Sequence, residues 1–242
     1  MSWERQGGLR EAIAQLAAQI MYGEEVKQYF TAKRLAAKRL LGRHGARGLR
    51  HRPSDLPSNG EIKAALLELV EDIEGDDRTR RLFAMRITAI EAMEQLLPLL
   101  PRLIGSVATG HVRAGSDVDL HVFAEDSTDV TAHVKTLGWV HEVQQVSILK
   151  HGKVREFTHV HVPDRFPLEL TVYAPRELGQ RPRSSTDGKP IVRLTPNAVR
   201  ALIEREHPEA WRRYGLTGEL ELGEAEDEDA MTDARAGRKY VE

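Results

Sequence analysis

The sequence predicts an α+β fold in which a helical region comes first, a small mixed β-sheet follows, and a further helix with an acidic tail comes last. Apolar residues recur at spacings of three and four through residues 1–98, which is the helical period. Short alternating apolar segments separated by turn residues occupy residues 99–194, and a helix-capping signal opens residues 195–242. Helices and strands that are segregated along the chain are typical of this class.

The first helical stretch is indicated by an apolar stripe at Leu9, Ile13, Leu16, Ile20, Val26, Phe30 and Leu35. Within it, Tyr29 and Phe30 are expected to lie in the core rather than to stack on nucleic-acid bases. Gly42, Gly45 and Gly48 break the pattern, and Pro53 and Pro57 mark a loop.

A second helix is predicted to begin at Ser58. Ser58 followed by Glu61 has the spacing of a capping box, in which each residue satisfies a backbone N–H of the other. Gly75 is expected to end this helix, and Asp76 or Asp77 to cap a third one that continues to residue 98.

The texture changes at residue 101, where strands are expected. The predicted strands are 102–105, 117–123, 139–148, 154–162 and 168–173, with a helix over 127–137. Turns are expected at 150–152 and 163–167, and residues 176–190 form a polar loop. Thr195 then caps a last helix whose first residue is Pro196, a preferred position for proline. This helix is expected to run to about Arg205, with Pro208 limiting it.

The composition excludes several classes of site. The 242 residues contain no cysteine, which rules out disulfides, thiol catalysis and thiolate metal sites. No apolar run reaches the 18 residues of a membrane span, and the charged N-terminus lacks the apolar segment of a secretory signal. We therefore expect a cytoplasmic protein.

The net charge of −2 hides a strong asymmetry. Residues 33–52 are basic without an acidic residue, through Lys33, Arg34, Lys38, Arg39, Arg43, Arg47, Arg50 and Arg52. Residues 219–229 are acidic, through Glu219, Glu221, Glu224, Glu226, Asp227, Glu228 and Asp229, and are expected to be flexible. The basic segment is typical either of a polyanion-binding surface or of a solvated helix face followed by a loop.

Two aspartates on one predicted strand are the strongest chemical signal. Side chains two residues apart on a strand point to the same face, so Asp117 and Asp119 share a face while Val118 and Leu120 face the core. Two carboxylates so close repel each other unless a cation lies between them. Carboxylate oxygens suit hard cations such as Mg²⁺, and a pair of such ions about 3.5–4 Å apart can clamp both oxygens of a phosphoryl displacement.

Gly105 and Ser106 provide a second signal just before the aspartates. A glycine at a strand end lets backbone N–H groups approach a phosphate, and the serine hydroxyl adds a donor. Ser116 and Arg113, from the same segment, are further candidates for nucleotide binding. The sequence has no P-loop motif, so any phosphate binding uses another device.

A third carboxylate is usually needed to complete such a site and to help deprotonate the attacking group. Glu169 is the candidate, because it alternates with leucines in an apolar strand, where a glutamate needs a partner or a purpose. A cross-strand salt bridge is the alternative. His159 and His161 share a strand face, either as metal ligands or as ordinary polar residues; whether they face Glu169 depends on the register of the 163–167 turn. His121 lies on the face of the two aspartates and can border the site.

These motifs together resemble the DNA polymerase β superfamily of nucleotidyltransferases, and most closely its minimal bacterial and aminoglycoside-nucleotidyltransferase branches. That signature is an apolar strand ending in Gly-Ser, about ten residues, Asp-x-Asp followed by an apolar residue, and an acidic residue from a later strand. The resemblance covers 103–123 and the strand around Glu169, which is under a third of the chain. Many minimal members have an arginine where this sequence has Thr109, so triphosphate contacts can come from elsewhere. By residue type, the other candidates are Arg113, Arg181, Arg183, Ser184 and Ser185.

The resemblance implies a nucleotidyltransferase fold and an enzyme that transfers a nucleoside monophosphate from an NTP, expected to be ATP, with release of pyrophosphate. Gly105 and Ser106 would hold the triphosphate, Asp117 and Asp119 would bind Mg²⁺ or Mn²⁺, and Glu169 would be a metal ligand or general base. The acceptor remains open between a small molecule, RNA and a protein. The alternative is a catalytically silent module that senses nucleotides or binds a protein, such as a partner in a toxin–antitoxin pair.

Overall fold

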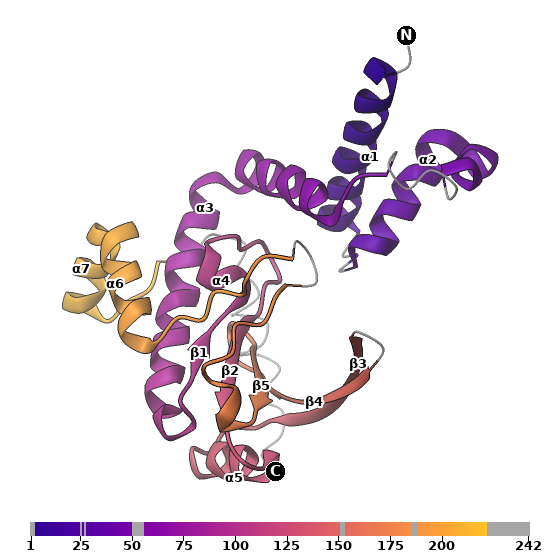
Figure 1. Ribbon diagram of the computed structural model, residues 1–242. Helices are drawn as coiled ribbons and strands as arrows, with labels where there is room; N and C mark the ends of the chain where they lie inside the picture. The colour runs from indigo at the N-terminus through magenta and orange to yellow at the C-terminus, as the bar shows by residue number, and fades with distance from the viewer. Residues whose placement is uncertain are drawn as a thin grey trace, which may run out of the picture. The chain divides into compact units, whose positions relative to one another are not determined.

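The computed structural model describes residues 3–24, 26, 28–49, 56–150, 153–184 and 188–221, and within them it has seven α-helices and one five-stranded mixed sheet (Figure 1). The predicted α+β class is confirmed. Backbone contacts divide the chain into two units. The N-terminal unit comprises Met1–Gly75 and Arg183–Pro190, and the sheet unit comprises Asp76–Pro182 and Ile191–Glu242.

The N-terminal unit is built from α1 (Trp3–Gly23), α2 (Tyr29–Leu49) and the first half of α3 (Asn59–Gln95). Its core contains Ile13, Ile20, Ala32, Ala36 and Ile62, each at most 1% exposed. The predicted apolar stripe does not continue unbroken, because the helix stops at residue 23 and resumes at residue 29. After this interruption, α2 contributes Ala32 and Ala36 to the core, and Phe30 stays outside it.

Phe30 is therefore a corrected prediction. It is 66% exposed, and the Arg34 guanidinium lies 5.5 Å from the centre of its ring. Tyr29, by contrast, packs partly buried against the core. The predicted break is confirmed at Gly42, whose φ of 66° and ψ of −179° are non-helical, whereas Gly45 and Gly48 lie within the helical stretch that runs to Leu49.

The capping box and the break at Gly75 are confirmed. The Ser58 backbone N–H donates to Glu61 Oε2 at 2.7 Å, and the Glu61 N–H donates to Ser58 Oγ at 3.2 Å. Gly75 has φ 43° and ψ −118°, which interrupts the helical backbone inside α3. Arg10 also donates to Glu61, through Nε and Nη2, each at 2.6 Å.

The sheet has the strand order β1-β2-β5-β4-β3, in which β2 and β5 are parallel and all other neighbours are antiparallel. The strands are β1 (Arg102–Leu103), β2 (Val118–Phe123), β3 (Glu142–Lys150), β4 (Lys153–Val162) and β5 (Leu168–Tyr173). All five lie where strands were predicted. The first is shorter than expected, because a short helix, α4 (Gly105–Thr109), starts directly after Ile104.

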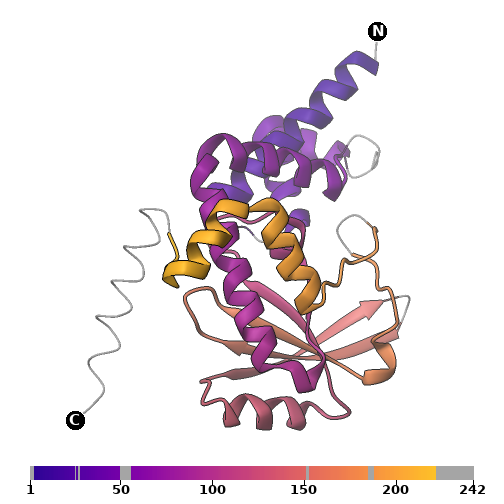
Figure 2. The same cartoon turned by 90° about the vertical axis from the view of Figure 1, so that its left-hand side faces the viewer.

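One face of the sheet forms the core of its unit (Figure 2). Val118, Leu120 and Val122 are completely buried, which confirms the predicted alternation, and Leu170 on β5 is equally buried. They cluster with the second half of α3 and with α5 (Ser127–Thr136). The opposite face is consequently left for the polar residues of the same strands.

The C-terminal helices are α6 (Pro196–Glu206) and α7 (Pro208–Thr217). Thr195 caps α6 as predicted, since its hydroxyl accepts from the Ala198 N–H at 3.3 Å. The second helix was not predicted. Pro208 was expected only to end α6, whereas it also occupies the first position of α7, where proline is favoured. Trp211 and Tyr214 of α7 pack against the core.

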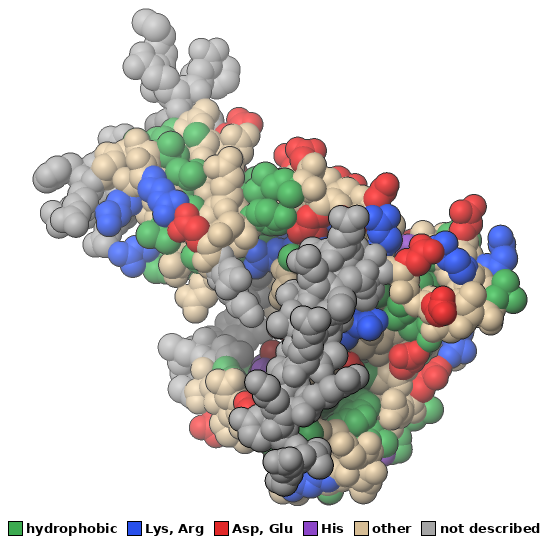
Figure 3. Space-filling view, turned by 180° about the vertical axis from the view of Figure 1, so that it is seen from behind, with side chains coloured by type: hydrophobic (Ala, Val, Ile, Leu, Met, Phe, Trp, Pro, Cys, Tyr) green, Lys and Arg blue, Asp and Glu red, His purple; other side chains and the backbone are tan. Residues whose placement is uncertain are grey.

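Of the basic segment 33–52, the side chains of Lys33, Arg34, Lys38 and Arg39 are described, and those from Arg43 onwards lie outside the described residues. Of the acidic tail, only Glu219 and Glu221 are described. Basic and acidic side chains are interspersed over the visible surface of each unit in Figure 3. In the part of the chain that is described, no helix combines the length and apolarity that crossing a bilayer requires.

Candidate functional site

A row of ionisable side chains crosses three strands on the polar face of the sheet. Asp119 on β2 pairs in register with Glu169 on β5, and Glu169 pairs with His161 on β4. Directly paired residues of neighbouring strands point to the same face. The Asp-x-Asp strand and the Glu169 strand are therefore neighbours, and Asp119 and Glu169 lie side by side on them.

The next row of the same face is His121, Thr171 and His159, again in register. Both His159 and His161 thus lie on the face of Glu169, which the sequence left open because it depends on the turn after β4. His159 Nδ1 lies 2.6 Å from Glu169 Oε1, and His161 Nδ1 lies 4.0 Å from Oε2. The three side chains are 16%, 40% and 28% exposed for His159, His161 and Glu169 respectively, so they are open to a ligand.

The Gly-Ser turn lies against Asp119. Gly105 has φ 69°, in the left-handed region, and a Cβ placed there would collide with Asp119 Oδ2 and lie 3.1 Å from its Cγ. The Ile104 N–H donates to the Asp119 carbonyl at 3.0 Å, which ties the turn to β2. Only glycine has both the required backbone freedom and the required lack of a side chain at this position.

Two arginines of α3 hold the far end of α4. Arg86 is 1% exposed and its Nε donates to the Val107 carbonyl at 3.3 Å, while Arg78 Nη1 donates to the Gly110 carbonyl at 2.8 Å. The Thr109 hydroxyl donates back to the Gly105 carbonyl at 3.0 Å. These contacts satisfy backbone carbonyls of α4 and of Gly110, which follows it. They thereby hold α4, and the Gly-Ser turn at its start, against α3.

The loop between α4 and β2 carries the other residues singled out for nucleotide binding. The Ser116 hydroxyl accepts from the Arg113 N–H at 3.0 Å, so Ser116 orders a turn as well as being available as a donor. Arg113, Ser116 and Asp117 are all partly buried. Asp117 directly precedes β2 and continues the alternation of Asp119, so both aspartates belong to the polar face.

His121 is a buried member of this face. It is 3% exposed, and its Nδ1 accepts from Arg193 Nε at 3.0 Å. Burial, together with the Arg193 positive charge, lowers the pKa of His121 to about 3. The imidazole is therefore neutral with its proton on Nε2, which suits a supporting residue better than a proton carrier at neutral pH.

Arg193 was not identified from the sequence. Its Nη1 donates to the Glu177 and Gln180 carbonyls at 3.1 and 2.9 Å, and its guanidinium lies 5.0 Å from the centre of the Tyr173 ring. It therefore ties the segment after β5 to His121. All its partners lie far away along the chain, and neither its spacing nor its neighbours signal this role.

The other sequence candidates for the triphosphate are divided between the two units. Arg181 is exposed and belongs to the sheet unit, whereas Arg183 and Ser184 group with the N-terminal unit. Ser185 lies outside the described residues. In the basic segment, Arg39 forms a salt bridge with Glu24 at 2.5 Å, so its charge is partly neutralised within the protein.

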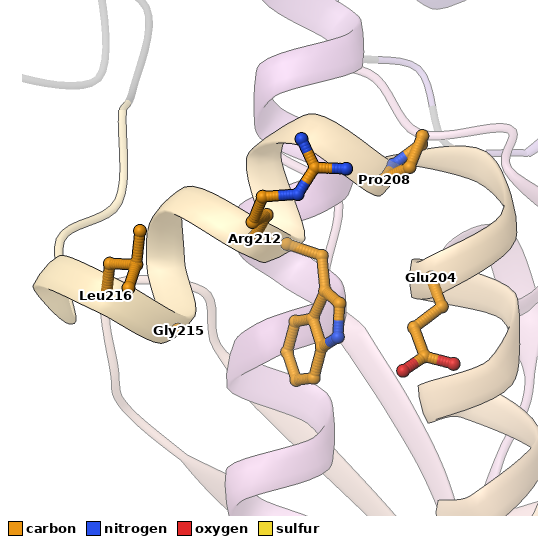
Figure 4. Close-up of a pocket in the computed structure, with 6 residues that line it drawn as sticks. Glu204, Pro208, Arg212, Gly215 and Leu216 are labelled. Atoms are coloured by element: carbon orange, nitrogen blue, oxygen red, sulfur yellow. The ribbon is translucent and has the colours of Figure 1, made fainter.

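An open pocket of about 530 Å³ lies elsewhere in the sheet unit, along α6 and α7. It is lined by Glu204, Pro208, Trp211, Arg212, Gly215 and Leu216 (Figure 4). Figures 1 and 2 show α6 and α7 against α3, on the side away from β3 and β4. None of the sequence-predicted site residues lines this pocket, and its few polar groups do not converge on one point.

No protein-family model matches the chain, and neither a curated protein nor a solved structure shows significant similarity to it.

Proposed function

We propose that the sheet unit has a nucleotidyltransferase fold and transfers a nucleoside monophosphate from an NTP, preferably ATP, to an acceptor, releasing pyrophosphate. One observation carries the proposal. A glycine turn of the kind that approaches a phosphate lies so close to the Asp119 carboxylate that a Cβ on Gly105 would collide with it, and Glu169 is the register partner of Asp119 on the next strand. This combination matches the Gly-Ser, Asp-x-Asp and later acidic residue of the polymerase β superfamily.

The donor set fits Mg²⁺ or Mn²⁺. Asp117, Asp119 and Glu169 offer carboxylate oxygens, which hard divalent cations prefer, and all three are partly rather than fully buried. When bound, such ions would neutralise the charge on the phosphates and on the attacking and leaving oxygens. The register of β2 and β5 keeps the carboxylates of Asp119 and Glu169 on one face of the sheet.

The chain's own groups would position the reactants for the transfer. The backbone N–H groups at the Gly105–Ser106 turn and the Ser106 hydroxyl would hold the triphosphate against the aspartates. An acceptor oxygen would attack the α-phosphorus, forming a new P–O bond as the bond to the bridging oxygen of pyrophosphate breaks. Glu169 would accept the acceptor's proton, with His159 hydrogen-bonded to its Oε1 and fixing its orientation.

Thr109 marks a difference from many minimal members of the superfamily, which have arginine at this point. Its hydroxyl is engaged with the Gly105 carbonyl, so it stabilises α4 instead of reaching a phosphate. Arg113 lies on the loop between the Gly-Ser turn and the two aspartates and is the preferred candidate for the triphosphate. The acceptor class, whether small molecule, RNA or protein, is left to the experiment.

The test is incubation of the full-length protein with each α-labelled NTP, Mg²⁺ or Mn²⁺, and a cell extract that supplies acceptors. Wild-type protein is expected to transfer label, with the size of the labelled product naming the acceptor class. Asp119→Asn should abolish transfer, and Glu169→Gln should slow it by about 10²–10⁴ if Glu169 acts as the general base. Metal-dependent NTP binding without transfer would favour the alternative of a catalytically silent module.

A matched pair of glycine variants checks the observation on which the proposal depends. Gly105 and Gly138 have φ of 69° and 73°, but only Gly105 has a neighbouring atom that a methyl group would strike. Both Gly→Ala changes should destabilise the protein by about 1–3 kcal/mol through backbone strain. Only Gly105→Ala should also abolish label transfer; equal transfer by the two variants would remove the Gly-Ser turn from the site.

A further inference from the structure

The polar face of the sheet carries a second set of metal-ligating groups, which shares Glu169 with the three candidate carboxylates and adds two histidines. One ring nitrogen each of His159 and His161 and one carboxylate oxygen of Glu169 all lie within 4.8 Å of one another. The two imidazole rings are stacked, with centroids 6.2 Å apart and planes inclined at 24°. The sheet imposes this arrangement, because His161 pairs with Glu169 and His159 is two residues earlier on the same strand.

We infer that His159, His161 and Glu169 form a binding site for a borderline transition cation such as Zn²⁺, distinct in its chemistry from the oxygen-only Asp117–Asp119 pair. Two imidazoles and one carboxylate, with a further position open to water or substrate, are a donor set typical of zinc and unsuited to Mg²⁺. The partial exposure of all three side chains leaves that further position accessible.

The state of His161 supports a ligand at this place. Its Nδ1 is the nitrogen that lies 4.0 Å from Glu169 Oε2, and its Nε2 is buried and has no hydrogen-bond partner among the described residues. Buried ring nitrogens are rarely left without a partner, and such an atom calls for a ligand or an ordered group.

His121 does not belong to the ligand set, although it lies in the neighbouring row. Its Nδ1 lone pair accepts the hydrogen bond from Arg193 Nε, and the remaining nitrogen consequently carries the proton. The site is therefore limited to residues of β4 and β5. A cation bound at His159 Nδ1 would take the place of the hydrogen bond between this nitrogen and Glu169 Oε1.

The inference does not depend on nucleotide transfer, and its test is direct binding. Metal-stripped full-length protein is titrated with Zn²⁺ by calorimetry, and with Co²⁺ as a spectroscopic substitute. One equivalent of Zn²⁺ is expected to bind. His159→Gln and His161→Gln should each weaken binding by at least about tenfold and alter the visible Co²⁺ spectrum. An Asp117→Asn/Asp119→Asn double variant should retain both signals.

The matched control is His133→Gln on α5, which removes a histidine that bonds the Gln95 carbonyl and lies outside the sheet. It should bind Zn²⁺ as the wild type does, and thermal unfolding of every variant verifies that it is folded. The inference is overturned if the wild type does not bind Zn²⁺ or if the two His variants bind Zn²⁺ as tightly as the wild type does. It is also overturned if only the Asp double variant loses Zn²⁺ binding. Label transfer in Mg²⁺ is scored separately, so Zn²⁺ binding without transfer would reject the proposed function and keep this site.

Discussion

His121 illustrates how one buried residue makes the stability of this protein depend on pH. The side chain is a buried member of the polar face, its Nδ1 accepts from Arg193, and its ring is tilted against that of Tyr173 with centroids 4.4 Å apart. Its folded-state pKa of about 3 is far below the 6.5 of an exposed histidine. As the pH falls below 6.5, the unfolded chain takes up a proton that the folded chain refuses, so stability is lost as the pH falls from there towards 3.

We expect His121→Asn to flatten this dependence, because the Asn amide oxygen can accept from Arg193 but does not titrate in this range. Between about pH 6.5 and pH 5, the wild type should lose about 2 kcal/mol more of unfolding free energy than the variant. Urea unfolding at both pH values measures the difference. Comparing the two proteins also cancels the contribution of His207, whose pKa is lowered by burial in both. Parallel pH profiles would contradict the prediction.

At the scale of elements, α3 acts as the support of the Gly-Ser turn, and Arg86 is its central contact. The guanidinium is buried and is shared between the Val107 carbonyl of α4 and Glu206 at the end of α6, with Nη1 and Oε2 2.7 Å apart. Nη1 also lies 3.2 Å from His207 Nε2. A single side chain thus connects three helices. Its buried positive charge is compensated by the Glu206 carboxylate, whose side chain is 39% exposed.

Glu206→Gln should therefore destabilise the protein by about 1–3 kcal/mol, since it leaves a buried cation without its counter-charge. The value lies below that of a fully buried pair because solvent reaches Glu206. Glu94→Gln is the matched control: Glu94 pairs with Arg200 at the surface, both nearly half exposed, and its loss should change stability by about 0.5 kcal/mol or less. If chemical unfolding gave the same loss of stability for both variants, burial of Arg86 would not be the reason that Glu206 stabilises the protein.

Predictability from sequence differed between elements for physical reasons. β2 and β5 could be located because alternating burial leaves a pattern within each strand, and the caps at Ser58 and Thr195 because they are local hydrogen bonds. The helix α7 was missed because Pro208 both ends one helix and begins the next. A proline at position 208 is compatible both with a loop after α6 and with the start of a new helix, so the residue type alone does not distinguish the two.

The site was predictable only in part, because some of its contacts are local in sequence and others join distant residues. Gly105 and Asp119 are close in sequence, so their motif is visible there, whereas the pairing of Glu169 with His161 depends on a turn register that side-chain types do not determine. Arg193 and Arg86 act through long-range contacts with backbone carbonyls. Carbonyls are present at every residue, and the sequence does not show which of them a distant arginine will reach.

At the scale of the whole molecule, the chain has two hydrophobic cores that share no residue within its described part. The core of the N-terminal unit lies between Ile13 and Val70, and that of the sheet unit between Leu82 and Ile203. Gly75, whose backbone leaves the helical region, falls between the two. Cores without common residues need not unfold together, so a single two-state transition is not expected.

Calorimetry should accordingly resolve two unfolding transitions, and a truncation in one core should lower only one of them. Ile62→Ala belongs to the N-terminal unit and Leu120→Ala to the sheet unit, and both residues are fully buried. Each change should destabilise its own unit by about 2–5 kcal/mol. If both variants lowered one common transition, the two units would form a single cooperative block.

The parallel pairing of β2 with β5 has a kinetic consequence. The helix α5 and the β3–β4 hairpin separate these strands along the chain, so Asp119 and Glu169 meet only after a long loop has closed. Pairings of this kind form late and slowly. A cation or nucleotide that needs both carboxylates can bind only the finished structure, and it should slow unfolding while leaving the refolding rate unchanged. Ligand concentration would then set how long the molecule stays folded, rather than how quickly it folds.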